Sequence, residues 1–312
     1  METFYHAVER FLSSLGEIGW AALGIALALH FLRLGVRVLA WRHIIRAAYP
    51  GTDVPRRGLF GAYVAGVGVN SITPARGGDL LRLFLAKRRV EGSTYPTLGA
   101  TLLPETLFDS VLAGSLILWG FAIGALPGLD VLPDLPTIDW SWIPRHPNAS
   151  IVIAGLALIA IAAAFVLAER RLQSFWERVR QGFAILHDPR RYVTRVVSWQ
   201  ALSWSFRFAS VYFFLEAFHM PATAHNALIV LIVQSISTLL PFTPGGVGTV
   251  QGLLVYIYRD EIATSTVLTF SVGMHVATVA ANLLLGFTAI LVMLRTLRWR
   301  RVVRPEERLA EP

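Results

Sequence analysis

The chain has 312 residues, of which 54% are hydrophobic and 15% charged, and its formal charge is +8 at pH 7. Globular proteins contain about 25% charged residues, so this composition excludes an ordinary soluble protein and favours a membrane protein. The absence of cysteine excludes disulfides, thiolate metal sites and cysteine nucleophiles.

The N-terminal part of the chain predicts a first membrane span. The apolar run 18–32 continues into Arg33 and Arg37 with no small-residue cleavage site behind it, so we expect a span at about 18–38 and no cleavable signal peptide. Segment 58–74 then lies between two basic stretches. A full crossing would leave the basic residues of 76–89 outside, so this segment is predicted to be a re-entrant hairpin entered from the cytoplasmic side.

The middle of the chain alternates between acidic and basic loops. A span at about 96–126 leads to the acidic, proline-rich loop 127–149, and the uncharged segment 150–168 returns. Aromatic and aliphatic residues recur at helical spacing among arginines over about 170–188, which predicts an amphipathic helix on the inner surface. Segment 196–217 then crosses outward.

The C-terminal part predicts a second hairpin and a last span. Segment 226–258 is broken by prolines and glycines and flanked by acidic loops, so we expect a re-entrant hairpin from outside. The span 262–294 returns to a basic tail. We therefore expect an all-α polytopic protein, with residues 1–312 as one transmembrane domain of about five spans plus two hairpins. Its N-terminus would be outside and its C-terminus inside a bacterial cytoplasmic (inner) membrane.

The basic residues are segregated along the chain. Four stretches, 33–57, 76–89, 170–195 and 295–308, hold 24 of the 28 Lys and Arg residues. Short cytoplasmic loops produce such a pattern by the positive-inside rule. The charge therefore does not indicate nucleic-acid binding, and the partners we expect are membrane lipids.

The two halves of the chain match at one constant offset in the numbering. Thr73-Pro74 aligns with Thr243-Pro244, Gly78 with Gly248, Arg37 with Arg207, and Glu105 with His275. The halves, about 15–127 and 195–297, are joined by the single span 150–168, which would give the second half the opposite orientation. We therefore predict an inverted repeat.

Breaks in the helices fall at corresponding positions of both halves. Unpaired backbone groups at membrane depth must be buried in protein or line a water-filled cavity. Such paired breaks are a pointer to a transporter's binding site, although a proline kink in a packed helix is the alternative. The residues at the breaks are Pro74, Gly77 and Gly78 in the first hairpin, and Pro241, Pro244, Gly245, Gly246, Gly248 and Gln251 in the second.

Ionisable residues at depth suggest a polar cavity. Glu105 and Asp109 lie on one helical face, Arg207 lies inside an apolar run, and His275 is near the middle of the last span. We expect Glu105, Asp109 and His275 to balance charge in a cavity where Arg207 binds an anionic head group. The alternative is a structural ion pair between Arg207 and Glu105 or Asp109.

Polar residues also gather at the first break. Asn70, Thr73, Arg76 and Arg82 are candidates to bind a lipid head group, because arginine forms bidentate contacts with phosphate. A helix starting near Gly78 would present free N–H groups to the same anion. Alternatively, Arg76 and Arg82 only anchor the hairpin at the inner interface. No histidine–carboxylate spacing suggests a metal site.

Three stretches carry a family resemblance: residues 70–82, Glu105-Thr-Leu-Phe-Asp109, and residues 241–251 with their Pro-Gly-Gly-Val-Gly element. Over about 15–295 the chain resembles the transmembrane flippase domain of lysylphosphatidylglycerol synthases and its stand-alone relatives. It departs at Gln251, where the family usually has Glu, and at Thr106, where it usually has Arg. We expect no counterpart of the synthases' aminoacyl-transferase domain.

The resemblance implies that a polar-headed lipid moves between leaflets. We expect a flippase or transporter for an anionic or modified phospholipid, or for a polyprenyl-phosphate lipid, with no cofactor and with a separate lipid-modifying synthase as a further candidate partner. One alternative is a membrane enzyme acting on a lipid-linked substrate, with Glu105 or Asp109 as general base. Another is an accessory lipid-binding protein. The sequence shows no nucleotide-binding motif, which leaves a proton gradient or downhill movement as the driving force.

Overall fold

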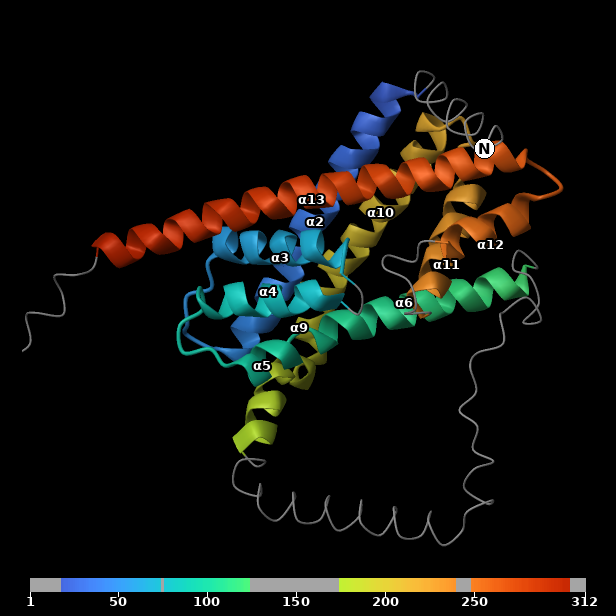
Figure 1. Cartoon of the computed structure of the whole chain (residues 1–312). Coiled ribbons are helices and arrows are strands. Elements are labelled where there is room, and N and C mark those ends of the chain that lie inside the picture. Colours follow the sequence, from blue (N-terminus) through green and yellow to red (C-terminus); the bar gives the residue numbers. More distant parts are fainter. Residues whose placement is uncertain (1–17, 74–75, 124–173, 240–247, 304–312) are drawn as a thin grey trace, which may run out of the picture.

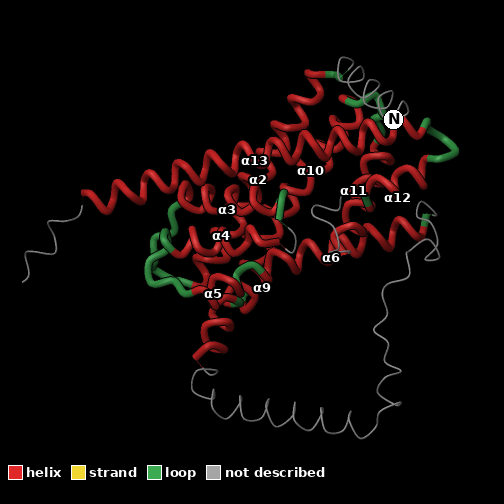
Figure 2. Tube along the Cα trace, in the orientation of Figure 1, coloured by secondary structure: helices red, strands yellow, loops and turns green. Residues whose placement is uncertain are grey.

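The computed structural model describes residues 18–73, 76–123, 174–239 and 248–303, and these are almost entirely helical, without strands (Figures 1 and 2). The first half contains α2 (Trp20–Ala48), α3 (Arg56–Asn70), α4 (Gly77–Lys87), α5 (Tyr95–Ala100) and α6 (Leu103–Ala122). A helical segment over 174–182 leads to a 3-10 turn (Ala184–His187), α9 (Pro189–Tyr192) and a π turn (Val193–Val197). The second half contains α10 (Ser198–Ala217), α11 (Ala224–Leu239), α12 (Thr249–Tyr258) and α13 (Thr264–Val303).

Three helical segments are long and apolar enough to cross a membrane: Trp20–Ala48, Tyr95–Ala122 and Thr264–Arg295. Large apolar side chains on them are exposed, for example Leu118 at 71% and Leu284 at 73%, as expected for surfaces that face lipid. The prediction of a helical membrane protein is confirmed. The predicted linker span 150–168 lies outside the described residues, and α10, which carries Arg207, is not among the three.

Helices α2 and α10 cross in opposite directions at the centre of the molecule (Figure 1). The Gly19 amide donates to the Ala217 carbonyl (2.9 Å), and the Ser210 hydroxyl donates to the Ala26 carbonyl (2.8 Å). At the other end of α2, Ala40 packs in one cluster with Val196. Small residues at these positions let the two backbones approach closely.

Helices α3 and α4 pack against each other in the region of the predicted first hairpin, and α3 also packs against α13. Glycine is required where they meet: a Cβ on Gly78 would lie 2.1 Å from the Gly66 carbonyl oxygen, and one on Gly68 would lie 2.9 Å from the Cα of Gly286 in α13. The hairpin is therefore a tightly packed pair. Whether it ends inside the bilayer stays a prediction.

The helix bounds repeat along the chain. The shift that aligns Gly78 with Gly248 moves α3 to 226–240, where α11 spans Ala224–Leu239, and moves α4 to 247–257, where α12 spans Thr249–Tyr258. The packing repeats as well, since α3 contacts α13 while α11 contacts α6. In Figure 1, α6 and α13 also run in opposite directions. Matched helix bounds, matched contacts and opposite helix directions are the features expected of an inverted repeat. The inverted repeat itself stays a prediction.

Candidate functional site: a buried charge cluster between the two halves

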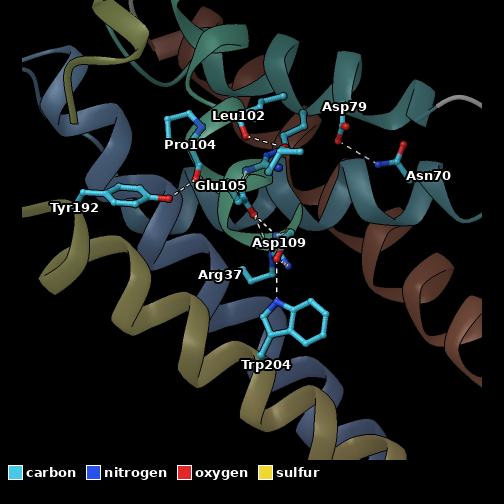
Figure 3. Close-up of polar contacts among 11 residues, drawn as sticks. Arg37, Asn70, Asp79, Leu102, Pro104, Glu105, Asp109, Tyr192 and Trp204 are labelled. Atoms are coloured by element: carbon cyan, nitrogen blue, oxygen red, sulfur yellow. Dashed lines mark hydrogen bonds and ion pairs between the residues drawn. The ribbon is translucent and has the colours of Figure 1, made fainter. Parts of the chain in front are cut away.

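Arg37 on α2 pairs with both carboxylates of α6 (Figure 3). Its Nε donates to Glu105 Oε1 (3.0 Å), its Nη1 donates to Asp109 Oδ1 (3.3 Å), and its Nη2 contacts both carboxylates. The side chains of Arg37 and Glu105 are 11% and 5% exposed, whereas that of Asp109 is 29% exposed. The ion pairs are therefore desolvated except at the Asp109 edge, where the cluster reaches the surface.

Arg82 on α4 occupies the other oxygen of Glu105. Its Nη2 lies 2.9 Å from Glu105 Oε2, and its guanidinium stacks 3.8 Å from the Trp41 ring centroid and 4.3 Å from that of Tyr63. The Trp41 indole is held in turn by a hydrogen bond to Thr101 Oγ1 (3.0 Å). Arg82 is buried, its Nη2 is paired with Glu105 and its face is covered by two aromatic rings, while its Nε has no hydrogen-bond partner in the described part of the chain. These contacts give it a packing role.

Asp109 ties α6 to α10. Its Oδ1 accepts a hydrogen bond from the Trp204 indole (2.9 Å) in addition to the contact with Arg37 (Figure 3). Five residues earlier on α6, the Pro104 carbonyl accepts a hydrogen bond from the Tyr192 hydroxyl (2.9 Å). Burial, assisted by the negative charge of Asp109, raises the pKa of Tyr192, so the phenol remains a donor. These contacts fix α6 against the start of the second half.

Arg207 has no carboxylate partner among the described residues. Its Nη2 donates to Gln234 Oε1 on α11 (2.8 Å), and its guanidinium lies 4.6 Å from the Trp204 ring centroid. The alternative of an ion pair between Arg207 and Glu105 or Asp109 is therefore wrong. The packing of α2 against α6 gives both carboxylates to Arg37 instead.

Polar atoms without partners lie at the crossing of α2 and α10. Within the described ranges, Arg33 Nε, Ser203 Oγ and both polar atoms of the Gln200 amide are buried with no hydrogen bond. Gln200 is 0% exposed and Ser203 is 1% exposed. Residue 19 of the chain lies beside residue 217, and residue 26 lies beside residue 210, because the two helices are antiparallel. Seven residues further along α2, Arg33 therefore lies opposite Ser203 on α10. Such groups are costly to leave unpaired, so this face of the crossing calls for water or a ligand.

The cluster as a whole is positively charged. Four arginines, at 33, 37, 82 and 207, face two carboxylates, so four positive charges less two negative ones leave +2. Buried His30, one turn before Arg33, bonds to the Asn282 side-chain oxygen (2.8 Å), and Asn282 donates to Ser71 (3.1 Å). This excess of positive charge is concentrated on the α2–α10 side, at Arg33 and Arg207.

The first-hairpin residues have mainly local partners. Asn70 Oδ1 accepts from the Gly78 amide (2.7 Å), and Asn70 Nδ2 donates to Asp79 Oδ1 (3.1 Å; Figure 3). The Gly78 N–H predicted to be free for an anion is therefore bonded to Asn70. Thr73 donates to the Val69 carbonyl (2.8 Å), and Arg76 is exposed in a left-handed conformation (φ 56°) just before Gly77.

The remaining predicted residues lie away from the cluster or outside the described residues. Gln251 Oε1 accepts from the Gly248 amide (2.8 Å) at the start of α12, a capping role that an amide fulfils. His275 is half-buried and makes no described contact with the cluster. Pro74, Pro241, Pro244, Gly245 and Gly246 lie outside the described residues. Within the described ranges, no three His, Asp or Glu residues are placed to bind a metal.

Several cluster residues are not singled out by the sequence. The charge count groups Arg33 and Arg37 with the basic residues that follow the apolar run 18–32 and assigns them to a cytoplasmic stretch. In the structure α2 continues to Ala48, so both arginines lie well inside the helix. Their spacing of four residues on one helical face was the available signal. Trp204, Gln200, Ser203 and Gln234 gave no comparable signal, because their role depends on how α10 and α11 pack.

A comparison with known proteins decides the family. The family described as lysylphosphatidylglycerol synthase TM region matches residues 4–286. The chain belongs to that family. The resemblance inferred from the three motifs is thereby confirmed, and membership is consistent with a lipid-related function in a membrane.

Two curated members of the lysylphosphatidylglycerol synthase TM region family are similar to this chain, both named UPF0104 membrane protein and both from Methanothermobacter thermautotrophicus. One is 26% identical over 317 residues, covering 89% of this chain and 87% of the relative. The other is 22% identical over 262 residues, covering 75% and 74%. No solved structure matches the chain significantly.

Proposed function

We propose that this protein is a lipid flippase or transporter that moves an anionic lipid between leaflets, with the head group held at the crossing of α2 and α10. The observation that carries the proposal is the buried cluster of net charge +2, in which Arg207 lacks a carboxylate among the described residues. Charge at membrane depth is costly and in membrane proteins usually marks a substrate or ion pathway.

The substrate class follows from the uncompensated charge. A phosphodiester such as phosphatidylglycerol would supply one of the two negative charges that the cluster lacks, and a polyprenyl monophosphate would supply up to two. Arginine suits the phosphate oxygens of both. Gln200 and Ser203 are buried without partners in the described part of the chain and would bond to the same group. The candidate head-group residues are therefore Arg33, Arg207, Gln200 and Ser203, in place of Arg82.

The route rests on the predicted inverted repeat. Two halves of opposite orientation would expose the α2–α10 crossing to each leaflet in turn, and the two hairpins would gate from opposite sides. The partly exposed Asp109 marks one edge of this path. In this proposal the membrane is the bacterial cytoplasmic membrane, with the N-terminus outside and the C-terminus inside.

Transport is favoured over an enzymatic role by the state of Glu105. This carboxylate contacts Arg37 and Arg82 with its two oxygens, so it is held as an anion and has little capacity to act as a general base. Charge balance, the role expected for Glu105 and Asp109 from the sequence, fits this geometry better.

Reconstituted vesicles test the proposal. The wild type should accelerate transbilayer movement of labelled phosphatidylglycerol relative to protein-free vesicles, and movement of labelled phosphatidylcholine much less. Arg207→Gln should abolish most of this acceleration, whereas Arg178→Gln, which removes an exposed arginine, should preserve it. Equal movement of the two lipids, or wild-type movement in Arg207→Gln, would refute the proposal.

A further inference from the structure

A second cationic site lies at the C-terminal end of α2. A cavity of about 450 Å³ is lined by Arg42 and Arg46 of α2, Tyr49, the turn at 50–54, and Arg191 of α9. Arg42 is nine residues past Arg33, so it lies about 13 Å further along the helix at 1.5 Å per residue. The cavity is therefore separate from the buried cluster.

The charges that line this cavity are poorly compensated. Three guanidinium groups face it and, among the described lining residues, Asp53 is the only carboxylate, which leaves an excess of two positive charges. Asp53 forms no ion pair within 4 Å in the described part of the chain. Arg46 and Arg191 are exposed, and across the described ranges neither guanidinium has a protein acceptor.

The walls of the cavity are held in place by polar contacts from three directions. Arg42 Nε donates to the Val54 carbonyl (2.7 Å), which orients that guanidinium. The Tyr49 hydroxyl accepts from the Thr94 amide (3.0 Å), and Gln181 Nε2 donates to the Ala48 carbonyl (2.7 Å). Arginines from α2 and α9, which are far apart in the sequence, thus meet on a fixed concave surface. The positive-inside rule accounts for arginines in cytoplasmic loops, where they can lie on any solvated surface. It does not account for three arginines that line one cavity.

The geometry points to a binding site for a phosphate group at the membrane surface. Guanidinium groups bind phosphate oxygens bidentately, and a volume of this size is at the lower end of the roughly 300–1,000 Å³ of small-ligand sites. The position at the end of a span is where a phospholipid head group lies. The same chemistry would accept a free phosphate monoester. The inference does not depend on lipid transport, because it concerns a different set of arginines.

Equilibrium binding to the purified full-length chain tests this inference, with phosphatidylglycerol against phosphatidylcholine counted by native mass spectrometry. Arg46→Gln/Arg191→Gln should lower phosphatidylglycerol affinity about tenfold or more, since each basic residue near an anionic surface contributes about fivefold. Arg178→Gln/Arg180→Gln removes the same charge from exposed positions. These two side chains do not line the cavity, so the affinity of the site should change by less than about twofold, well below the effect of the lining arginines.

A variant that binds phosphatidylglycerol more tightly than the wild type cannot owe this result to misfolding. Asp53→Asn removes the lining carboxylate and should raise the affinity about fivefold, by the same rule for a single charge. Displacement of the lipid by glycerol phosphate would assign the site to phosphate esters in general, and failure to displace it would assign the site to the lipid head group.

Equal losses in the two double variants, or unchanged binding in Asp53→Asn, would overturn the inference. Binding at this cavity should persist in Arg207→Gln. A failure of the transport proposal and a failure of this inference are therefore distinguishable.

Discussion

Arg37 and Arg207 are matched by the numbering offset that also aligns Gly78 with Gly248, yet their surroundings differ. Arg37 is paired with Glu105 and Asp109, whereas Arg207 has the neutral Gln234 amide and the face of Trp204. The same offset matches Glu105 and Asp109 with His275 and Val279, neither of which is a carboxylate. One half of the cluster is neutralised and stabilises the bundle. The other keeps its charge, and in our proposal it binds the anionic head group.

Removal of Glu105 should have the largest effect on the neutralised side. Glu105→Ala leaves Arg37 and Arg82 without their shared carboxylate, and loss of one partner of a buried ion pair costs about 3–5 kcal/mol. Unfolding in mixed micelles of increasing SDS fraction measures this loss. Glu91→Ala, at an exposed position, is the control, and equal stability of the two variants would contradict a structural role for Glu105.

Substitution of the two arginines separates the halves directly. Arg37→Gln should destabilise the protein by about 3 kcal/mol because Asp109 loses its cation and Glu105 keeps only Arg82. Arg207→Gln loses one hydrogen bond, worth about 1 kcal/mol, but it also removes a buried charge that lacks a carboxylate, so stability should change by no more than about 1 kcal/mol. The same unfolding assay compares them, and a larger cost for Arg207→Gln would reverse the assignment of roles.

Gln200 should respond in the opposite direction. Gln200→Leu removes a buried amide without partners in the described part of the chain and should stabilise the protein by about 1–2 kcal/mol, while weakening binding of an anionic lipid. Gln181→Leu is the matched control: its amide donates to the Ala48 carbonyl, so this change should destabilise. Destabilisation by both substitutions would mean that the Gln200 amide has a partner in the native state.

Tyr192 should show the smallest effect. Tyr192→Phe removes the hydrogen bond to the Pro104 carbonyl and should lower stability by about 1 kcal/mol, with lipid movement unchanged. Loss of lipid movement without loss of stability would indicate that the contact between α9 and α6 takes part in transport.

The sequence was informative about elements and poor at predicting partners. Apolar length and charge segregation predicted the three long spans, and the constant offset between the halves anticipated the matching bounds of α3 with α11 and α4 with α12. The pairing of Arg37 in place of Arg207 could not be predicted, since it depends on the packing of α2 against α6. Arg33 was missed because a rule that counts charges near span ends does not distinguish a solvated arginine from one buried at a helix crossing.

The most direct test uses the absence of cysteine from the chain. Ser203→Cys is close to isosteric and places a single thiol at the α2–α10 crossing, and Ser210→Cys places one two turns away, where the native hydroxyl is already bonded to Ala26. If the crossing is an anion site, a negatively charged methanethiosulfonate should modify Cys at 203 faster than a positively charged one. Phosphatidylglycerol should slow that reaction, and Cys at 210 should stay unreactive. An unreactive thiol at 203, or a rate indifferent to reagent charge and to anionic lipid, would contradict the account.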